Sequence, residues 1–88
     1  MKITLDIPYY DGNGLDVVWE TGSKYAINIA DNNVTILANK NALVSIAKQM
    51  LYMAYNDLPK GSHVHYDSFF TKMDEEEYKL VIEKEIVS

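Results

Sequence analysis

The chain has 88 residues, which is enough for one domain with one hydrophobic core, so we treat residues 1–88 as a single domain. Its 13 Asp and Glu residues outweigh 8 lysines, it has no arginine, and its formal net charge is −5. This balance argues against a nucleic-acid partner, because a basic surface supplies most of the affinity for nucleic acid.

The chain has no cysteine, which favours a reducing compartment. It shows no signal peptide and no apolar run near the roughly 20 residues that a membrane helix needs. We therefore expect a cytoplasmic protein with no membrane partner and no cofactor.

Alternating apolar residues predict four antiparallel strands in the first part of the chain. The turn dipeptides Asp11-Gly12 and Asn13-Gly14 separate the first two strands, and a run of short Asx side chains, which tolerate positive φ, separates the last two. The predicted strands cover residues 2–7, 15–20, 24–30 and 34–38.

One amphipathic helix is predicted to follow. Asn39 is suited to cap it, and Pro59 with Gly61 ends it. Its apolar residues recur at intervals of three and four, which predicts a stripe facing the core. This stripe consists of Leu43, Ile46, Ala47, Met50, Leu51 and Ala54.

Two further strands are predicted after the helix, at residues 62–67 and from residue 78 onward. A connection, with room for one helical turn at its acidic run, would join them. The expected fold is an α+β two-layer sandwich: a mostly antiparallel sheet of about six strands, with one long helix on one face and the order β-β-β-β-α-β-β. The connection through the helix is long enough for a crossover, which leaves one parallel pair open.

The stretch GSHVHYD holds both histidines of the chain. On a strand, His63, His65 and Asp67 project from one face, since side chains alternate. Such a trio is a candidate metal site, which an acidic residue such as Glu83 would have to complete. The alternative is an exposed sheet face, with the residues between the histidines turned to the core. No nucleophile-elbow or phosphate-loop pattern is present, so we predict no catalytic residues and no enzyme.

Two other features are candidate contacts for a partner. The acidic run Asp74, Glu75, Glu76 and Glu77 is either a solvated turn or a patch that steers a basic partner. Tyr52 and Tyr55 fall off the predicted apolar stripe and are expected to be exposed together, and tyrosine is a favoured anchor of interfaces.

From residue 33 to 85 the chain resembles a family of small bacterial immunity proteins of polymorphic toxin systems. The resemblance is carried by the helix, by the last strand with its I-E-K ending, and by a P-x-G-x-H-x-H-x-D segment. In this chain that segment consists of Pro59, Gly61, His63, His65 and Asp67. The link NKN before the helix departs from the glycine-containing link of the family.

The resemblance implies a binding protein that neutralises a cognate toxin domain by occlusion. Toxins of these systems are often nucleases, which tend to be basic, so a basic nuclease domain is a candidate partner for this acidic chain. The expected partner-binding residues are the histidine segment, the acidic run and the two helix tyrosines. The alternative function is a small metal-binding or hydrolytic domain centred on His63, His65 and Asp67, and a self-associating scaffold is a third.

Overall fold

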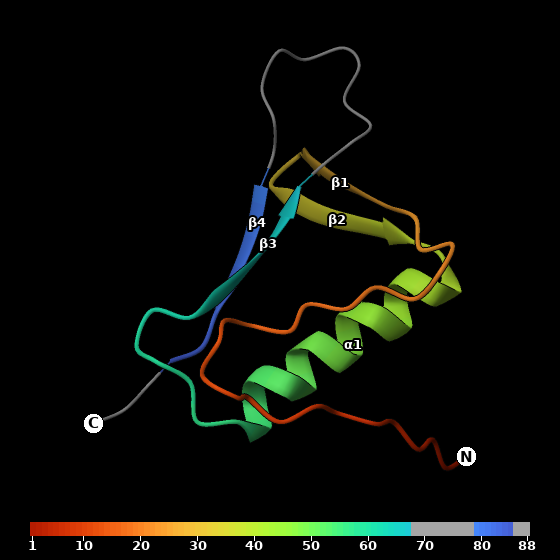
Figure 1. Cartoon of the computed structure of the whole chain (residues 1–88). Helices are drawn as coiled ribbons and strands as arrows, with labels where there is room; N and C mark the ends of the chain where they lie inside the picture. Colours follow the sequence, from red (N-terminus) through yellow and green to blue (C-terminus); the bar gives the residue numbers. More distant parts are fainter. Residues whose placement is uncertain (68–78, 86–88) are drawn as a thin grey trace.

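A computed structural model describes residues 1–67 and 79–85 of the chain (Figure 1). The fold is α+β, with one helix and two separate antiparallel sheets of two strands each. The elements in chain order are β1 (Tyr25–Ala30), β2 (Asn33–Ala38), α1 (Lys40–Tyr55), β3 (His63–Asp67) and β4 (Lys79–Glu83). No helix within these residues has the length and apolar character needed to cross a membrane.

The β1–β2 hairpin confirms two of the predicted strands and the turn between them. Tyr25 lies opposite Ala38 and Ala30 opposite Asn33, so only two residues form the loop. These residues, Asp31 and Asn32, have φ of 52° and 64°. Two successive positive φ values define the turn that matches the twist of a two-residue hairpin, and short Asx side chains adopt them at low cost.

The strands β3 and β4 confirm the two strands predicted after the helix. They pair antiparallel, with His63 opposite Glu83 and Asp67 opposite Lys79. Both strand pairs of the described chain are antiparallel, and β2 does not pair with β3, so the parallel pair left open by the sequence does not form. The predicted connection between the two strands lies outside the described residues.

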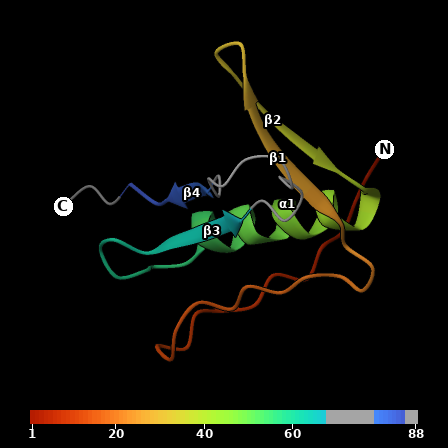
Figure 2. The same cartoon turned by 90° about the horizontal axis from the view of Figure 1, so that it is seen from above.

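The predicted six-strand sandwich and its strand order are wrong. Residues 2–7 and 15–20 form no strand and run past α1 without joining a sheet (Figures 1 and 2). The turn end of the β1–β2 hairpin projects away from α1, β3 and β4 (Figure 2), while Ile27 of β1 remains in the core. Helix side chains, rather than neighbouring strands, supply the partners for the backbone of residues 8–24.

The helix and its two flanking residues bind this segment through a row of polar side chains. From residue 41 to 56 their spacing of three to four residues places them along one side of the helix, and Asn39 adds the N-cap position. Near the end of the helix, Asn56 bonds the backbone of Pro8 and Tyr10, Tyr52 bonds that of Asp16, and Gln49 bonds that of Val18. Toward its start, Ser45 bonds the backbone of Glu20, Asn41 bonds that of Thr21, and Asn39 bonds that of Gly22 and Lys24. We call this row the polar ladder.

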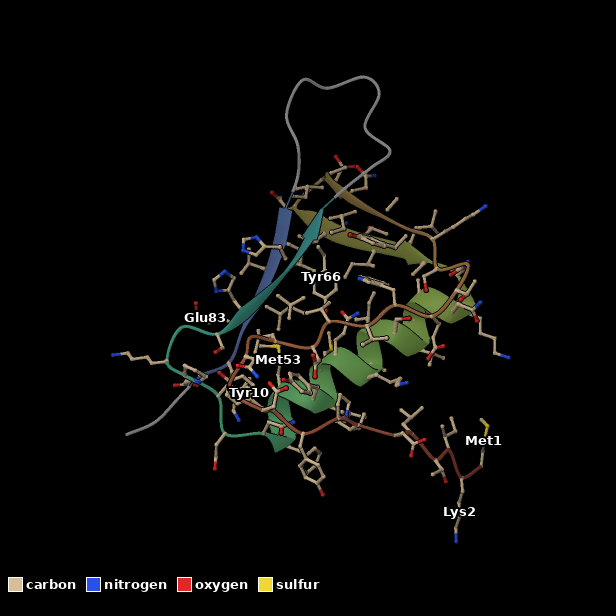
Figure 3. All side chains as sticks on the ribbon, viewed as in Figure 1. Met1, Lys2, Tyr10, Met53, Tyr66 and Glu83 are labelled. Atoms are coloured by element: carbon tan, nitrogen blue, oxygen red, sulfur yellow. The ribbon has the colours of Figure 1, made fainter. Side chains whose placement is uncertain are left out.

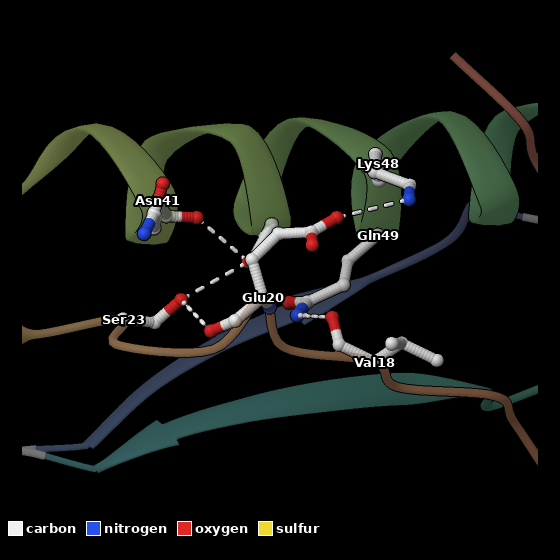
Figure 4. Close-up of polar contacts among 7 residues, drawn as sticks. Val18, Glu20, Ser23, Asn41, Lys48 and Gln49 are labelled. Carbon is white, nitrogen blue, oxygen red and sulfur yellow. Dashed lines mark hydrogen bonds and ion pairs between the residues drawn. The ribbon is translucent and has the colours of Figure 1, made fainter.

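The centre of the polar ladder is buried. Gln49 Nε2 donates to the Val18 carbonyl at 3.0 Å (Figure 4). The Glu20 amide donates to Ser45 Oγ at 2.8 Å. Gln49 is 3% exposed and Ser45 is fully buried. Lys48 adds an ion pair with Glu20 at 3.2 Å, at a partly exposed position (Figure 4). Because buried polar groups need partners, these bonds fix the position of the segment.

The buried side of α1 therefore differs from the predicted apolar stripe. Of that stripe only Ile46 is buried, while Leu43 is 56% and Met50 is 43% exposed. The helix instead turns the polar ladder toward residues 8–24 and its remaining buried residues toward the sheets. The buried helix residues are Ala42, Ser45, Ile46, Gln49, Tyr52 and Met53. The predicted cap is confirmed, because the Ala42 amide donates to Asn39 Oδ1 at 2.9 Å.

The core lies between α1 and the two sheets. Tyr66 of β3 and Met53 of α1 both project into it (Figure 3). Trp19 stacks on Tyr25 with ring centroids 5.0 Å apart, and both rings meet Tyr66 edge to face. Tyr66 Oη donates to Gln49 Oε1 at 2.7 Å, which joins the aromatic cluster to the polar ladder.

Candidate functional site

The outward side of β3 and β4 carries both histidines. His63 and His65 are exposed, and their ring centroids lie 4.6 Å apart. The strand register places Glu83 opposite His63 and Val81 opposite His65. Val81 is 47% exposed and Glu83 is exposed as well. We call these four residues the histidine face.

Strand alternation and a tight turn produce this arrangement. Val64 and Tyr66, the neighbours of the histidines, are 4% and 2% exposed and belong to the core, so the histidines must face outward. The turn before β3 closes with a hydrogen bond from the Ser62 amide to the Pro59 carbonyl, and Gly61 adopts φ of 87° within it. Only glycine adopts this conformation without strain.

The turn also orients His63. Its Nδ1 lies 2.7 Å from the Gly61 carbonyl oxygen, which can only accept, so the proton of the neutral ring sits on Nδ1. Nε2 is then left as a hydrogen-bond acceptor. An oriented acceptor next to a second imidazole and an apolar Val81 forms a small mixed surface of the kind that contacts another protein.

The histidine face gains no support as a metal site within residues 1–67 and 79–85. No three His, Asp or Glu side chains in these residues converge closely enough to hold an ion. Asp67 ends β3 opposite Lys79, and its side chain lies outside the described part of the structure.

The other predicted contact residues fall in different places. The acidic run Asp74, Glu75, Glu76 and Glu77 lies outside the described residues. Tyr55 is 79% exposed, as expected, but Tyr52 is 2% exposed. The expectation that both tyrosines are exposed is therefore wrong for Tyr52, whose hydroxyl accepts a hydrogen bond from the Asp16 amide at 3.4 Å and belongs to the polar ladder.

Two features of the surface were not predicted as partner contacts. The first is the pairing of Val81 and Glu83 with the histidines, which depends on the β3–β4 register. The second is an open, mostly apolar hollow of about 560 Å³ at the base of the β1–β2 hairpin. It is lined by Lys24, Tyr25, Ala26, Leu37, Ala38 and Asn39, so it lies apart from the histidine face.

Comparison with known families identifies the class of this protein. A family model described as Immunity protein 32 (Imm32) matches residues 33–85, from β2 to just beyond β4. The match covers more than half of the chain and includes α1 and the histidine face. The protein is thus a small α+β immunity protein.

More particularly, the chain belongs to the Immunity protein 32 family. This membership suggests an immunity role without catalysis, and it implies a cognate toxin as the binding partner. No curated protein and no solved structure matches the chain.

Proposed function

We propose that the protein neutralises a cognate toxin of a bacterial polymorphic toxin system by binding and covering its active surface. The observation that carries this proposal is the Immunity protein 32 match over residues 33–85. The site described above supports it, because the exposed histidine face offers contact groups and no arrangement that would suggest turnover. The protein would act in stoichiometric amounts. We place it in the cytoplasm, because a chain without cysteine needs no disulfide and suits a reducing compartment.

The histidine face is our proposed centre of the partner-binding surface. His63 and His65 are exposed and contribute nothing to the core, so their side chains are free for recognition. Asp67, the acidic run Asp74, Glu75, Glu76 and Glu77, and the exposed Tyr55 are proposed as further contacts. Tyr52 does not belong to this set, because its side chain is buried and cannot contact a partner.

Charge defines the chemistry of the proposed partner. The formal net charge of −5 and the absence of arginine fit a basic surface, such as that of a nuclease domain. Opposite net charges speed encounter, and salt screens this attraction within about 10 Å at 0.1 M. The affinity of the complex should therefore fall as salt is added.

A binding titration with the product of the reading frame immediately upstream, the candidate toxin, tests this proposal. Calorimetry would compare the natural protein, His63→Ala/His65→Ala, and the control Asn28→Ala, which changes an exposed strand residue away from the histidine face. We expect one-to-one binding, a Kd raised by about tenfold or more in the double variant, and no change in the control. All three proteins should keep the same circular dichroism spectrum.

Three results would count against parts of this proposal. No complex with a folded toxin would remove the pairing with that gene product. Equal binding by the double variant would remove the histidine face from the interface. A Kd that stays constant between about 50 mM and about 300 mM salt would remove the electrostatic component.

A further inference from the structure

The second strand of the hairpin has an open edge. β1 pairs with one side of β2, and no described strand pairs with the other. In an antiparallel pair, alternate residues direct their N–H and C=O groups away from the neighbour. The outward groups of β2 make no hydrogen bond within the described residues, and the strand is exposed over nearly its whole length.

This edge lacks the usual protection against pairing. Natural edge strands carry lysine, proline, a bulge or a covering loop, because an open edge is a template for another strand. β2 has the sequence NVTILA, with no charge, no proline and a continuous register to β1. Val34, Ile36 and Leu37 are 57%, 39% and 73% exposed. A strand of this kind is suited to accept a neighbour.

We propose that β2 pairs antiparallel with β2 of a second copy, so that two chains form a twofold-symmetric dimer with a continuous sheet β1-β2-β2-β1. Side chains of directly opposite residues in a sheet point to the same face. The twofold axis must therefore pass through a pair of identical residues and not between two pairs. Centring it on Ile36 places Ile36 against its own copy and Val34 against Ala38 of the partner subunit. The two copies of Ile36, together with Val34 and Ala38, then extend the apolar face of the hairpin that also includes Ile27.

Charge at the ends of the strand favours a second copy as the occupant. β2 itself is uncharged, so two copies place no like charges opposite each other along the strand. Antiparallel pairing brings Lys40, two residues after β2, to the end where Asp31 of the partner subunit lies in its turn. Neither residue has an ion-pair partner within the described part of one chain. Because the dimer is twofold symmetric, this pair of opposite charges occurs at both ends of the paired strands.

The apolar side chains that the strand exposes would be covered in such a dimer, since Val34 and Ile36 are 57% and 39% exposed on the face that the pairing continues. The histidine face lies on the other sheet, so the proposed dimer leaves it accessible in both chains.

Analytical ultracentrifugation of the natural protein and two matched variants tests the dimer. Val34→Lys alters β2, and Ile29→Lys alters its cross-strand partner on β1, which is 44% exposed on the same face. We expect twice the 10.1 kDa mass for the natural protein and for Ile29→Lys. Val34→Lys loses one cross-strand contact per copy, and two such losses raise the dimer Kd about thirtyfold.

Hydrogen exchange of the natural protein gives a second measurement that needs no variant. On dilution, we expect alternate amides of β2 to exchange about tenfold faster or more, while the amides of β1 stay unchanged. A monomer at concentrations up to about 1 mM would overturn the proposal. Equal weakening by Val34→Lys and Ile29→Lys would also overturn it. Protection of β2 amides only after the toxin is added would overturn self-association and assign this edge to the toxin.

Discussion

Replacing Gln49 with leucine tests whether the polar ladder holds residues 8–24 in place. The amide of Gln49 donates to the Val18 carbonyl and accepts from the Tyr66 hydroxyl. Leucine has a similar volume but offers neither bond. The Tyr66 hydroxyl would lose its partner at a residue that is 2% exposed, so little water would replace it.

The expected loss of unfolding free energy is about 2–3 kcal/mol. An unsatisfied buried hydroxyl costs about 1–3 kcal/mol, and a carbonyl that water can still reach costs about 1 kcal/mol or less. A chain of this length has a total stability of about 4–13 kcal/mol, so the change is large enough to measure. Lys48→Gln is the neighbouring control, because its partly exposed ion pair with Glu20 contributes less than about 1 kcal/mol.

Urea unfolding monitored by the fluorescence of Trp19 measures both variants. With a slope of about 1 kcal/mol per M, Gln49→Leu should lower the midpoint by about 2 M. If residues 15–20 instead paired as a strand in a sheet, Gln49 would be a solvated helix position. Its replacement would then change the stability by less than about 0.5 kcal/mol. That result would refute the polar ladder.

Three further predictions give measurable outcomes. Burial, with a smaller effect of Tyr25, raises the pKa of Tyr66 above its ordinary value of 10.0, so the folded state favours the neutral phenol. The contribution of the Tyr66 phenol to stability should be constant below about pH 10 and fall at higher pH, and Tyr66→Phe should lessen that fall in urea titrations. Ile46→Ala should cost about 2–4 kcal/mol, whereas Leu43→Ala should cost less than about 0.5 kcal/mol, and equal losses would contradict the observed helix orientation. Asn56→Ala should speed exchange of the Tyr10 amide, and unchanged exchange there would show that the Asn56 side chain does not hold this segment.

Local signals in the sequence predicted most of the elements that form. The Asx turn between β1 and β2 and the cap at Asn39 depend on residues only a few positions apart. The alternation in β3 likewise offered, as the alternative to a metal site, Val64 and Tyr66 in the core with the two histidines outside, and the structure has this arrangement. These features follow from backbone geometry and burial, which a short stretch of sequence specifies.

The partners of residues 2–7 and 15–20 could not be predicted in the same way. Alternation indicates an extended chain but does not show what satisfies its backbone groups. In residues 15–20, side chains of α1 satisfy some of those groups, so this segment adds no strand to the hairpin sheet. The same bonds turn Gln49 and Tyr52 inward and leave Leu43 exposed, which a pattern based on hydrophobicity assigns the other way.

The candidate site was predictable to the extent that it depends on one strand. The outward position of His63 and His65 follows from β3 alone. Their cross-strand neighbours Val81 and Glu83 depend on the β3–β4 register, which no local pattern specifies. The burial of Tyr52 depends on the polar ladder and was therefore missed as well.

Growth of bacteria that express the reading frame immediately upstream, the candidate toxin gene, tests the immunity function most directly. The toxin gene would be induced alone, with the natural protein, and with the His63→Ala/His65→Ala variant. We predict that the toxin alone stops growth, that the natural protein restores it, and that the folded variant restores it less. A toxic product that stays equally toxic beside the soluble, folded natural protein would contradict the proposed neutralisation of that toxin.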